Sequence, residues 1–217
     1  FLTDNHCKID PPRRAYIDIE TDSEVSFAEA IKGNTRLLSF AIVDEEGNQQ
    51  KAVLEDWHDR AEAELWGHFW TLMGDYDQIA AWNGDRFDFA VQKARIQLLM
   101  HKHGKVLQSY WEHFRRLLFV DQMLVFKRHH MAAESGDEKT SAKLGDVCQA
   151  LIGEGKEVAD EDLADLVGRK GMGGSTTALW KAGGYARQKL LDYNLQDTAL
   201  LPKLEAETGY LALQQTI

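Results

Sequence analysis

Tyr16-Ile17-Asp18-Ile19-Glu20-Thr21 is the stretch that decides the fold, because it is an apolar strand with two carboxylates set two residues apart. Side chains alternate between the two faces of a strand, so Asp18 and Glu20 share one face while Ile17 and Ile19 share the other. Two neighbouring acids in a buried strand are costly, and a bound divalent cation is the usual way to offset that cost. The stretch therefore indicates a hard-metal site on a buried strand, although such a pair alone is also typical of an exposed edge strand.

The elements around this strand predict a mixed sheet. Strands are expected at about 13–20, 35–43, 49–54, 78–82 and 117–120, and helices at about 60–73, 87–103, 141–152 and 184–207. Residues 44–48 are expected to form a hairpin turn. Three strands with short connections, followed by strand–helix–strand–helix, indicate an antiparallel meander with parallel strands added beside the first. The predicted fold class is α/β, with a five-stranded mixed sheet flanked by helices.

The 217 residues are expected to form a single domain. A short N-terminal extension is expected at about 1–12 and a mobile loop at about 129–141, because neither segment shows periodicity. Thr140 or Ser141 is expected to cap the helix that follows this loop. Residues 154–184 contain a short acidic helix and a glycine-rich stretch at 171–174. That stretch lacks the order of a phosphate-binding loop and is interpreted as a flexible loop.

Composition and charge exclude several classes of protein. The net charge of −10 argues against nonspecific affinity for nucleic acid over the whole surface. No apolar run approaches the roughly 18 residues that a membrane helix needs, so no membrane partner is expected. The two cysteines lie far apart in the sequence, which favours a reducing environment. The chain start has no signal-peptide pattern, and we expect an intracellular location, in the cytoplasm, nucleoid or nucleus, rather than secretion.

Two further segments carry carboxylates at the expected ends of elements. Asn83 through Asp88 lies where a strand ends and a helix begins, and Tyr193 and Asp197 are one turn apart on the last helix. Each segment alone has an ordinary interpretation. Asp88 is in a position to cap its helix, and Tyr193 and Asp197 are compatible with a surface position.

Together the three segments resemble a known set of nuclease motifs. Asp18-x-Glu20, Asn83-x-x-x-Phe87-Asp88 and Tyr193-x-x-x-Asp197 are similar to the three exonuclease motifs of the DEDD superfamily, and the tyrosine matches its DEDDy branch. The chain resembles the proofreading 3′–5′ exonuclease domain of family B DNA polymerases and related stand-alone nucleases, over about residues 14–208. That family has an RNase H-like fold, which agrees with the mixed sheet predicted above.

The resemblance implies a set of site residues and a mechanism. Asp18, Glu20, Asp88 and Asp197 would hold two Mg²⁺ or Mn²⁺ ions, because carboxylate oxygens suit hard cations. Tyr193 would orient the attacking water. Three further residues would bind substrate: Thr21, Asn83 and Phe87. Phe87 is equally compatible with a place in the core.

The resemblance further implies hydrolysis of single-stranded or frayed DNA from its 3′ end, with release of nucleoside monophosphates. RNA is an alternative substrate, because nothing in the sequence reads the 2′-hydroxyl. A tethered or partner replication or repair module would fit the overall acidity. Two rival hypotheses remain open: a catalytically silent nucleic-acid-binding or scaffold domain, and an exoribonuclease or endonuclease of the same fold. The chain departs from the family in a long excursion after Thr21 and in residues 154–184.

Overall fold

The computed structural model describes residues 11–131, 141–155, 163, 165–168 and 175–214. One sheet has the strand order β3-β2-β1-β4-β5. The strands are β1 (Arg14–Thr21), β2 (Leu37–Asp44), β3 (Gln49–Val53), β4 (Gln78–Ala81) and β5 (Leu118–Asp121). β1, β2 and β3 pair antiparallel, while β4 pairs parallel with both β1 and β5. The predicted mixed five-stranded sheet is confirmed.

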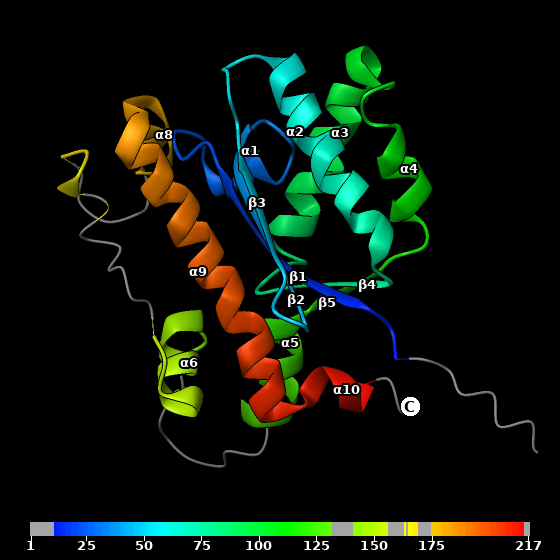
Figure 1. The fold of residues 1–217 in the computed structure, drawn as a ribbon, viewed down its shortest axis with the longest axis vertical. Coiled ribbons are helices and arrows are strands. Elements are labelled where there is room, and N and C mark those ends of the chain that lie inside the picture. Colours follow the sequence, from blue (N-terminus) through cyan, green and yellow to red (C-terminus); the bar gives the residue numbers. More distant parts are fainter. Residues whose placement is uncertain (1–10, 132–140, 156–162, 164, 169–174, 215–217) are drawn as a thin grey trace, which may run out of the picture.

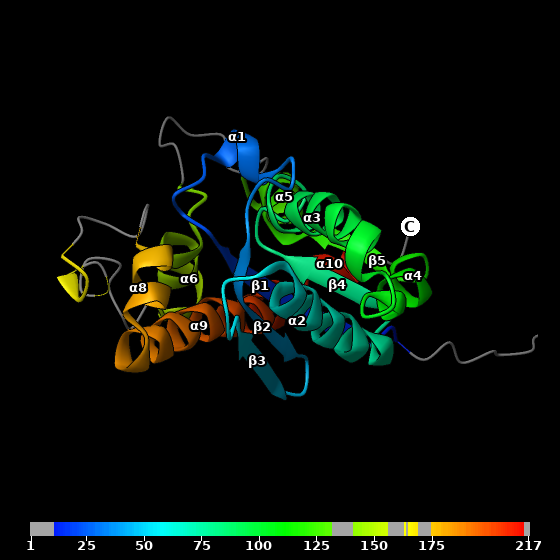
Figure 2. The same ribbon diagram turned by 90° about the horizontal axis from the view of Figure 1, so that it is seen from above.

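Helices cover both faces of this sheet (Figures 1 and 2). The helices are α1 (Phe27–Ala30), α2 (Asp59–Leu72), α3 (Asp88–His103), α4 (Gln108–Phe114), α5 (Gln122–Phe126), α6 (Leu144–Ile152), α8 (Thr176–Ala182), α9 (Gly184–Thr208) and α10 (Tyr210–Gln214), with a 3₁₀ turn η1 (Met73–Asp75) and a π turn η2 (Lys127–Met131). α2, α3 and α4 gather on one side, and the long α9 crosses the other side beside α6 and α8. Within the described residues, no helix combines the length and the apolar character needed to cross a bilayer.

The alternation of β1 divides its side chains between the two layers. Ile17 and Ile19 enter a large core with the aromatic residues of α2, where Phe69 meets Trp66 and Trp70 edge to face. Tyr16 faces the opposite layer and packs in a smaller cluster with residues of β4, α5, α9 and α10. The acids that follow Tyr16 at two-residue intervals therefore lie on the side of α9.

Several predicted boundaries need correction. Residues 129–131 belong to η2 rather than to a mobile loop, while 132–140 lie outside the described residues. Ser141 does not cap α6: the helix begins after Lys143 without a side-chain cap, and the Ser141 hydroxyl donates to Asp146 instead. Thr140, residues 1–10 of the predicted extension and the glycine-rich 171–174 also lie outside the described residues. The single-domain organisation stays a prediction.

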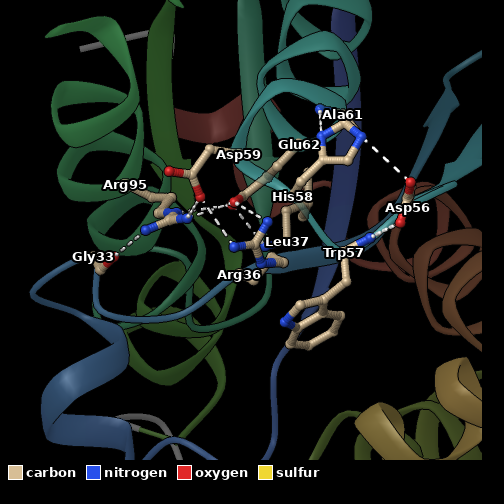
Figure 3. A network of polar contacts seen from close by, with 10 residues as sticks. All are labelled: Gly33, Arg36, Leu37, Asp56, Trp57, His58, Asp59, Ala61, Glu62 and Arg95. Atoms are coloured by element: carbon tan, nitrogen blue, oxygen red, sulfur yellow. Dashed lines mark hydrogen bonds and ion pairs between the residues drawn. The ribbon is translucent and has the colours of Figure 1, made fainter. Parts of the chain in front are cut away.

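A buried carboxylate ties α2 and α3 to the sheet (Figure 3). Glu62 has no exposed surface, and its carboxylate accepts from the Leu37 N–H at 3.0 Å and from the Arg95 guanidinium at 2.6 and 2.9 Å. Arg36 adds an ion pair at 3.6 Å. A buried carboxylate is tolerated only when such partners satisfy it. The network therefore fixes α3, whose first residue is Asp88, against β2.

We expect Glu62→Ala to lower the free energy of unfolding by about 3–5 kcal/mol, because it leaves two guanidinium groups without their buried partner. Urea unfolding followed by circular dichroism measures the change. Glu64→Ala is the matched control: among the described residues Glu64 pairs with Arg60 alone, on the exposed side of the same helix, and its loss should cost no more than about 0.5 kcal/mol. Equal losses in the two variants would contradict the role assigned to Glu62.

Candidate active site

The two acids of β1 face α9. The Asn194 amide of α9 donates to Asp18 Oδ2 at 2.5 Å. Glu20 lines a pocket together with Tyr193, which also lies on α9. Both acids are partly exposed, whereas Ile17 and Ile19 on the opposite face are buried. The structure thus places Asp18 and Glu20 on one face, toward the helix that carries the third motif.

Asp88 reaches the same region from the first turn of α3. The turn before it holds Asn83 at a φ of 64°, and the Asn83 carbonyl accepts from the N–H groups of Arg86 and Phe87. The helix cap is Phe87, without a side-chain bond, so the capping interpretation of Asp88 is wrong. Instead, Asp88 Oδ1 accepts from the backbone N–H of Ile19 at 3.3 Å. Asp88 is buried and is tied to β1 between its two acids.

The third motif lies in the middle of α9. Tyr193 is buried with 6% of its surface exposed, and Asp197 is partly exposed one turn further along. Asp192, the neighbouring acid, points elsewhere and pairs with Lys51 of β3 at 2.8 Å. The structure therefore separates the motif residues from this nearby acid.

Burial and neighbouring like charges raise the pKa of Asp18 and of Asp88. The pKa of Asp18 lies well above its usual range, because of burial first and then the charges of Asp88, Glu20 and Asp197; the Asn194 hydrogen bond opposes the shift. Burial raises the pKa of Asp88 to about 7, with a smaller rise from the charge of Asp121, against the lowering effect of N–H bonds from its own backbone and from Ile19. The other three predicted acids thus lie within electrostatic reach of Asp18.

These carboxylates suit a divalent cation in donor type and charge. All four offer hard oxygen ligands, and a cation would relieve the repulsion that raises the pKa of Asp18. In the part of the chain that the structure describes, neither Asp18 nor Asp88 forms an ion pair with Lys or Arg. Across the same residues, no group of three or more His, Cys, Asp or Glu side chains is arranged so that it could hold a metal ion. The fold collects the donors without setting them in a finished coordination shell.

Most of the predicted substrate-binding residues meet in one pocket of about 380 Å³ beside the acids. Its lining residues are Glu20, Thr21, Asp22, Ser23, Val25, Phe27, Ala30, Phe87, Thr176 and Tyr193. Phe87 is partly exposed there and also packs against the large core, so its place in the core is observed and its contact with substrate stays a prediction. Thr21 is buried, and its carbonyl accepts from the Thr176 hydroxyl at 2.8 Å, which ties α8 to the end of β1.

Asn83 does not join this pocket. It lines a second pocket of about 560 Å³ with Trp82, Met123 and residues 142–146. The turn from Asn83 to Phe87 therefore separates the two pockets and contributes one side chain to each. Within the described residues, the Asn83 side-chain amide forms no hydrogen bond.

Three residues near the site were missed in the sequence. Phe27 of α1 is 55% exposed and stacks on Phe87, with ring centroids 5.6 Å apart. Thr176 closes the pocket from α8. Asn194 directly follows Tyr193 in the third motif, and this place in the sequence was the only indication of a role for Asn194. Phe27 lies in the excursion after β1, where a lone phenylalanine in a polar run was the only cue.

Asp121 and Asp85 lie nearby but have structural contacts. Asp121 caps α5 through the Leu124 N–H and also accepts from the Asp85 N–H. Burial, together with the Asp121 charge, raises the pKa of Asp85. Neither acid lines the pocket that Glu20 and Tyr193 share.

Comparison with known proteins identifies the superfamily. Residues 15–167 match the family model described as the RNase_H superfamily. This match covers more than half of the chain, so the chain belongs to the RNase H superfamily. No curated protein matches the sequence.

A solved structure agrees with this assignment. The chain is similar to the family B DNA polymerase from the hyperthermophilic archaeon Pyrobaculum calidifontis, with a TM-score of 0.58 and 16% identity, over 90% of this chain and 25% of the polymerase. The chain therefore spans about a quarter of that polymerase. At this identity the likeness is one of fold. The predicted resemblance to RNase H-like proteins and family B polymerases is confirmed.

Burial of the Asp88 carboxyl predicts a pH dependence of stability in the absence of metal. The pKa rises from 3.8 to about 7, so the folded state keeps a proton that the unfolded chain releases in this range. The contribution of this group to stability is present below about pH 4 and is lost as the pH rises through 7. In EDTA, the free energy of unfolding should fall over this window. In the Asp88→Asn variant, the free energy of unfolding should fall by at least about 1 kcal/mol less over the same window. If the wild type and the variant gave identical urea unfolding curves at every pH, this prediction would be wrong.

Proposed function

We propose that the protein is a metal-dependent 3′–5′ exonuclease of the DEDDy type. The observation that carries the proposal is the convergence of Asp18, Glu20, Asp88 and Asp197, from three distant segments, beside a pocket that Tyr193 lines. Membership of the RNase H superfamily and the fold of a family B polymerase support a nuclease. Four carboxylates and a phenol in this arrangement suit phosphodiester hydrolysis.

The acids would hold two Mg²⁺ or Mn²⁺ ions. Bound there, the ions would supply an activated water and neutralise the charge on the leaving 3′ oxygen. Tyr193 would hold the attacking water by a hydrogen bond, since a phenol with a pKa near 10 is a weak base at neutral pH. Because Tyr193 is largely buried, its hydroxyl has few orientations available and is suited to positioning.

The pocket beside the acids would take the terminal nucleotide. Phe27 and Phe87 stack at its wall and leave Phe27 exposed, which offers an aromatic face to a base. Thr21 would contact the 3′ end. The second pocket, which Asn83 lines, would take the nucleotides that precede the terminal one in the strand.

The net charge of −10 favours contact with a few nucleotides at a 3′ end over contact with the backbone of a long duplex. DNA is the proposed substrate, and RNA is the alternative that the assay below decides. A tethered or partner replication or repair module would add affinity for the substrate, in keeping with a chain that spans about a quarter of the polymerase it resembles.

The test is an assay on oligonucleotides carrying a 5′ label, in DNA and in RNA, with Mg²⁺, with Mn²⁺ and with chelator. We expect a ladder of products shortened one nucleotide at a time from the 3′ end, only with metal. Internal cuts would indicate an endonuclease of the same fold. Binding without cleavage would indicate a silent nucleic-acid-binding domain, and absence of both would favour a scaffold.

Removing a metal ligand should abolish most of the activity. We expect Asp18→Ala and Asp197→Ala each to lower the rate by at least about a thousandfold while the protein stays folded. Asp192→Ala is the control, because Asp192 is adjacent to Tyr193 in the sequence but its side chain pairs with Lys51. Wild-type activity in either ligand variant, with the metal present, would refute the assignment.

The aromatic wall should affect substrate binding more than chemistry. Phe27→Ala should raise KM about tenfold with kcat nearly unchanged, since one stacking contact is lost. Tyr193→Phe should lower kcat by about ten- to a hundredfold with little effect on KM. Steady-state kinetics on a single-stranded trinucleotide separates the two cases. The reverse pattern, a kcat effect at Phe27 and a KM effect at Tyr193, would contradict these roles.

A further inference from the structure

Asn194 forms a hydrogen-bonded link between two strands and the last helix. Its side-chain nitrogen donates to Asp18 Oδ2 at 2.5 Å, and its side-chain oxygen accepts from the Ser39 hydroxyl at 3.4 Å. Ser39 lies on β2 directly opposite Glu20 of β1, so its side chain shares the face of the acids. The link therefore runs from β2 through α9 to β1.

The chemistry of the partners fixes the direction of this link. The Asn194 amide turns its NH₂ group to Asp18 and its oxygen to the Ser39 hydroxyl, which suits a carboxylate that binds a cation in its ionised form and then only accepts hydrogen bonds. Neither Asn194 nor Ser39 has exposed surface, so water does not replace either bond. The Thr198 hydroxyl donates to the Asn194 backbone carbonyl at 2.7 Å, a bond within α9 that is not part of this link.

The held oxygen belongs to an acid with three acidic neighbours. Asp18 experiences the charges of Asp88, Glu20 and Asp197 at once. A carboxylate under that repulsion turns away unless a donor holds one of its oxygens. With Oδ2 held by Asn194, the rotation of the group is fixed, and the direction of its second oxygen is set.

We propose that Asn194 is a positioning residue that aims the Asp18 carboxylate at the cation site, and that Ser39 sets the orientation of Asn194. The inference rests on the proposed metal-dependent function. Groups that orient metal ligands from behind affect metal affinity strongly. Asn194 itself touches neither the substrate nor the cation.

The test is a titration of the purified protein with Mn²⁺, followed by electron paramagnetic resonance of the free ion and by calorimetry. Asn194→Ala should raise the Kd for Mn²⁺ about tenfold. Ser39→Ala keeps the amide but loses its anchor and should raise the Kd about two- to threefold. Thr198→Val is the control, because it removes a buried hydroxyl of the same helix and should leave the Kd unchanged. Thermal unfolding checks that each variant is folded.

The outcomes separate a positioning role from a merely structural one. A structural role would lower the melting temperature of all three variants and leave the Kd for Mn²⁺ unchanged, which would overturn the inference. If the wild type binds Mn²⁺ but releases no nucleotide, the proposed exonuclease function fails, and the Kd ratios still decide the role of Asn194. If the wild type binds no Mn²⁺, both proposals fail.

Discussion

Repulsion among closely placed, partly buried carboxylates is the constraint on which the site depends. Asp18 shares its surroundings with three other acids, and the buried Asp88 accepts a backbone hydrogen bond from the strand that carries Asp18. An arrangement of this kind works against the stability of the empty fold. A cation bound among the four acids would neutralise their charge and make the arrangement favourable, so the acids are to be interpreted as one set.

The rest of the molecule holds these acids in place against that repulsion. The aromatic core under β1 and the Glu62 network fix α2 and α3 on one face, and α3 begins with Asp88. On the other face α9 brings Asn194 against Asp18, while α8 ties the end of β1 through Thr176. Each of the three segments that supply an acid is thus anchored by contacts beyond the acids themselves.

The strands and the long helices could be predicted because their patterns extend over several residues. β1 alternates cleanly, and α9 carries its motif at helical spacing and ends before Gly209, whose φ is 63°. The short helices could not, since α1 spans 4 residues and α5 spans 5, too few to show a period. For the same reason the exposed face of Phe27 and its contact with Phe87 were invisible in the sequence. Asn83 was correctly placed at a turn, but only the fold shows that it belongs to a different pocket from Phe87.

The most direct test of the central claim is anomalous diffraction from crystals of the protein soaked in Mn²⁺. The account predicts anomalous peaks among the carboxylates of Asp18, Glu20, Asp88 and Asp197, with these side chains drawn in around them. The account would be contradicted if Mn²⁺ bound at full occupancy elsewhere on the surface while no anomalous peak appeared among these four side chains and they did not move.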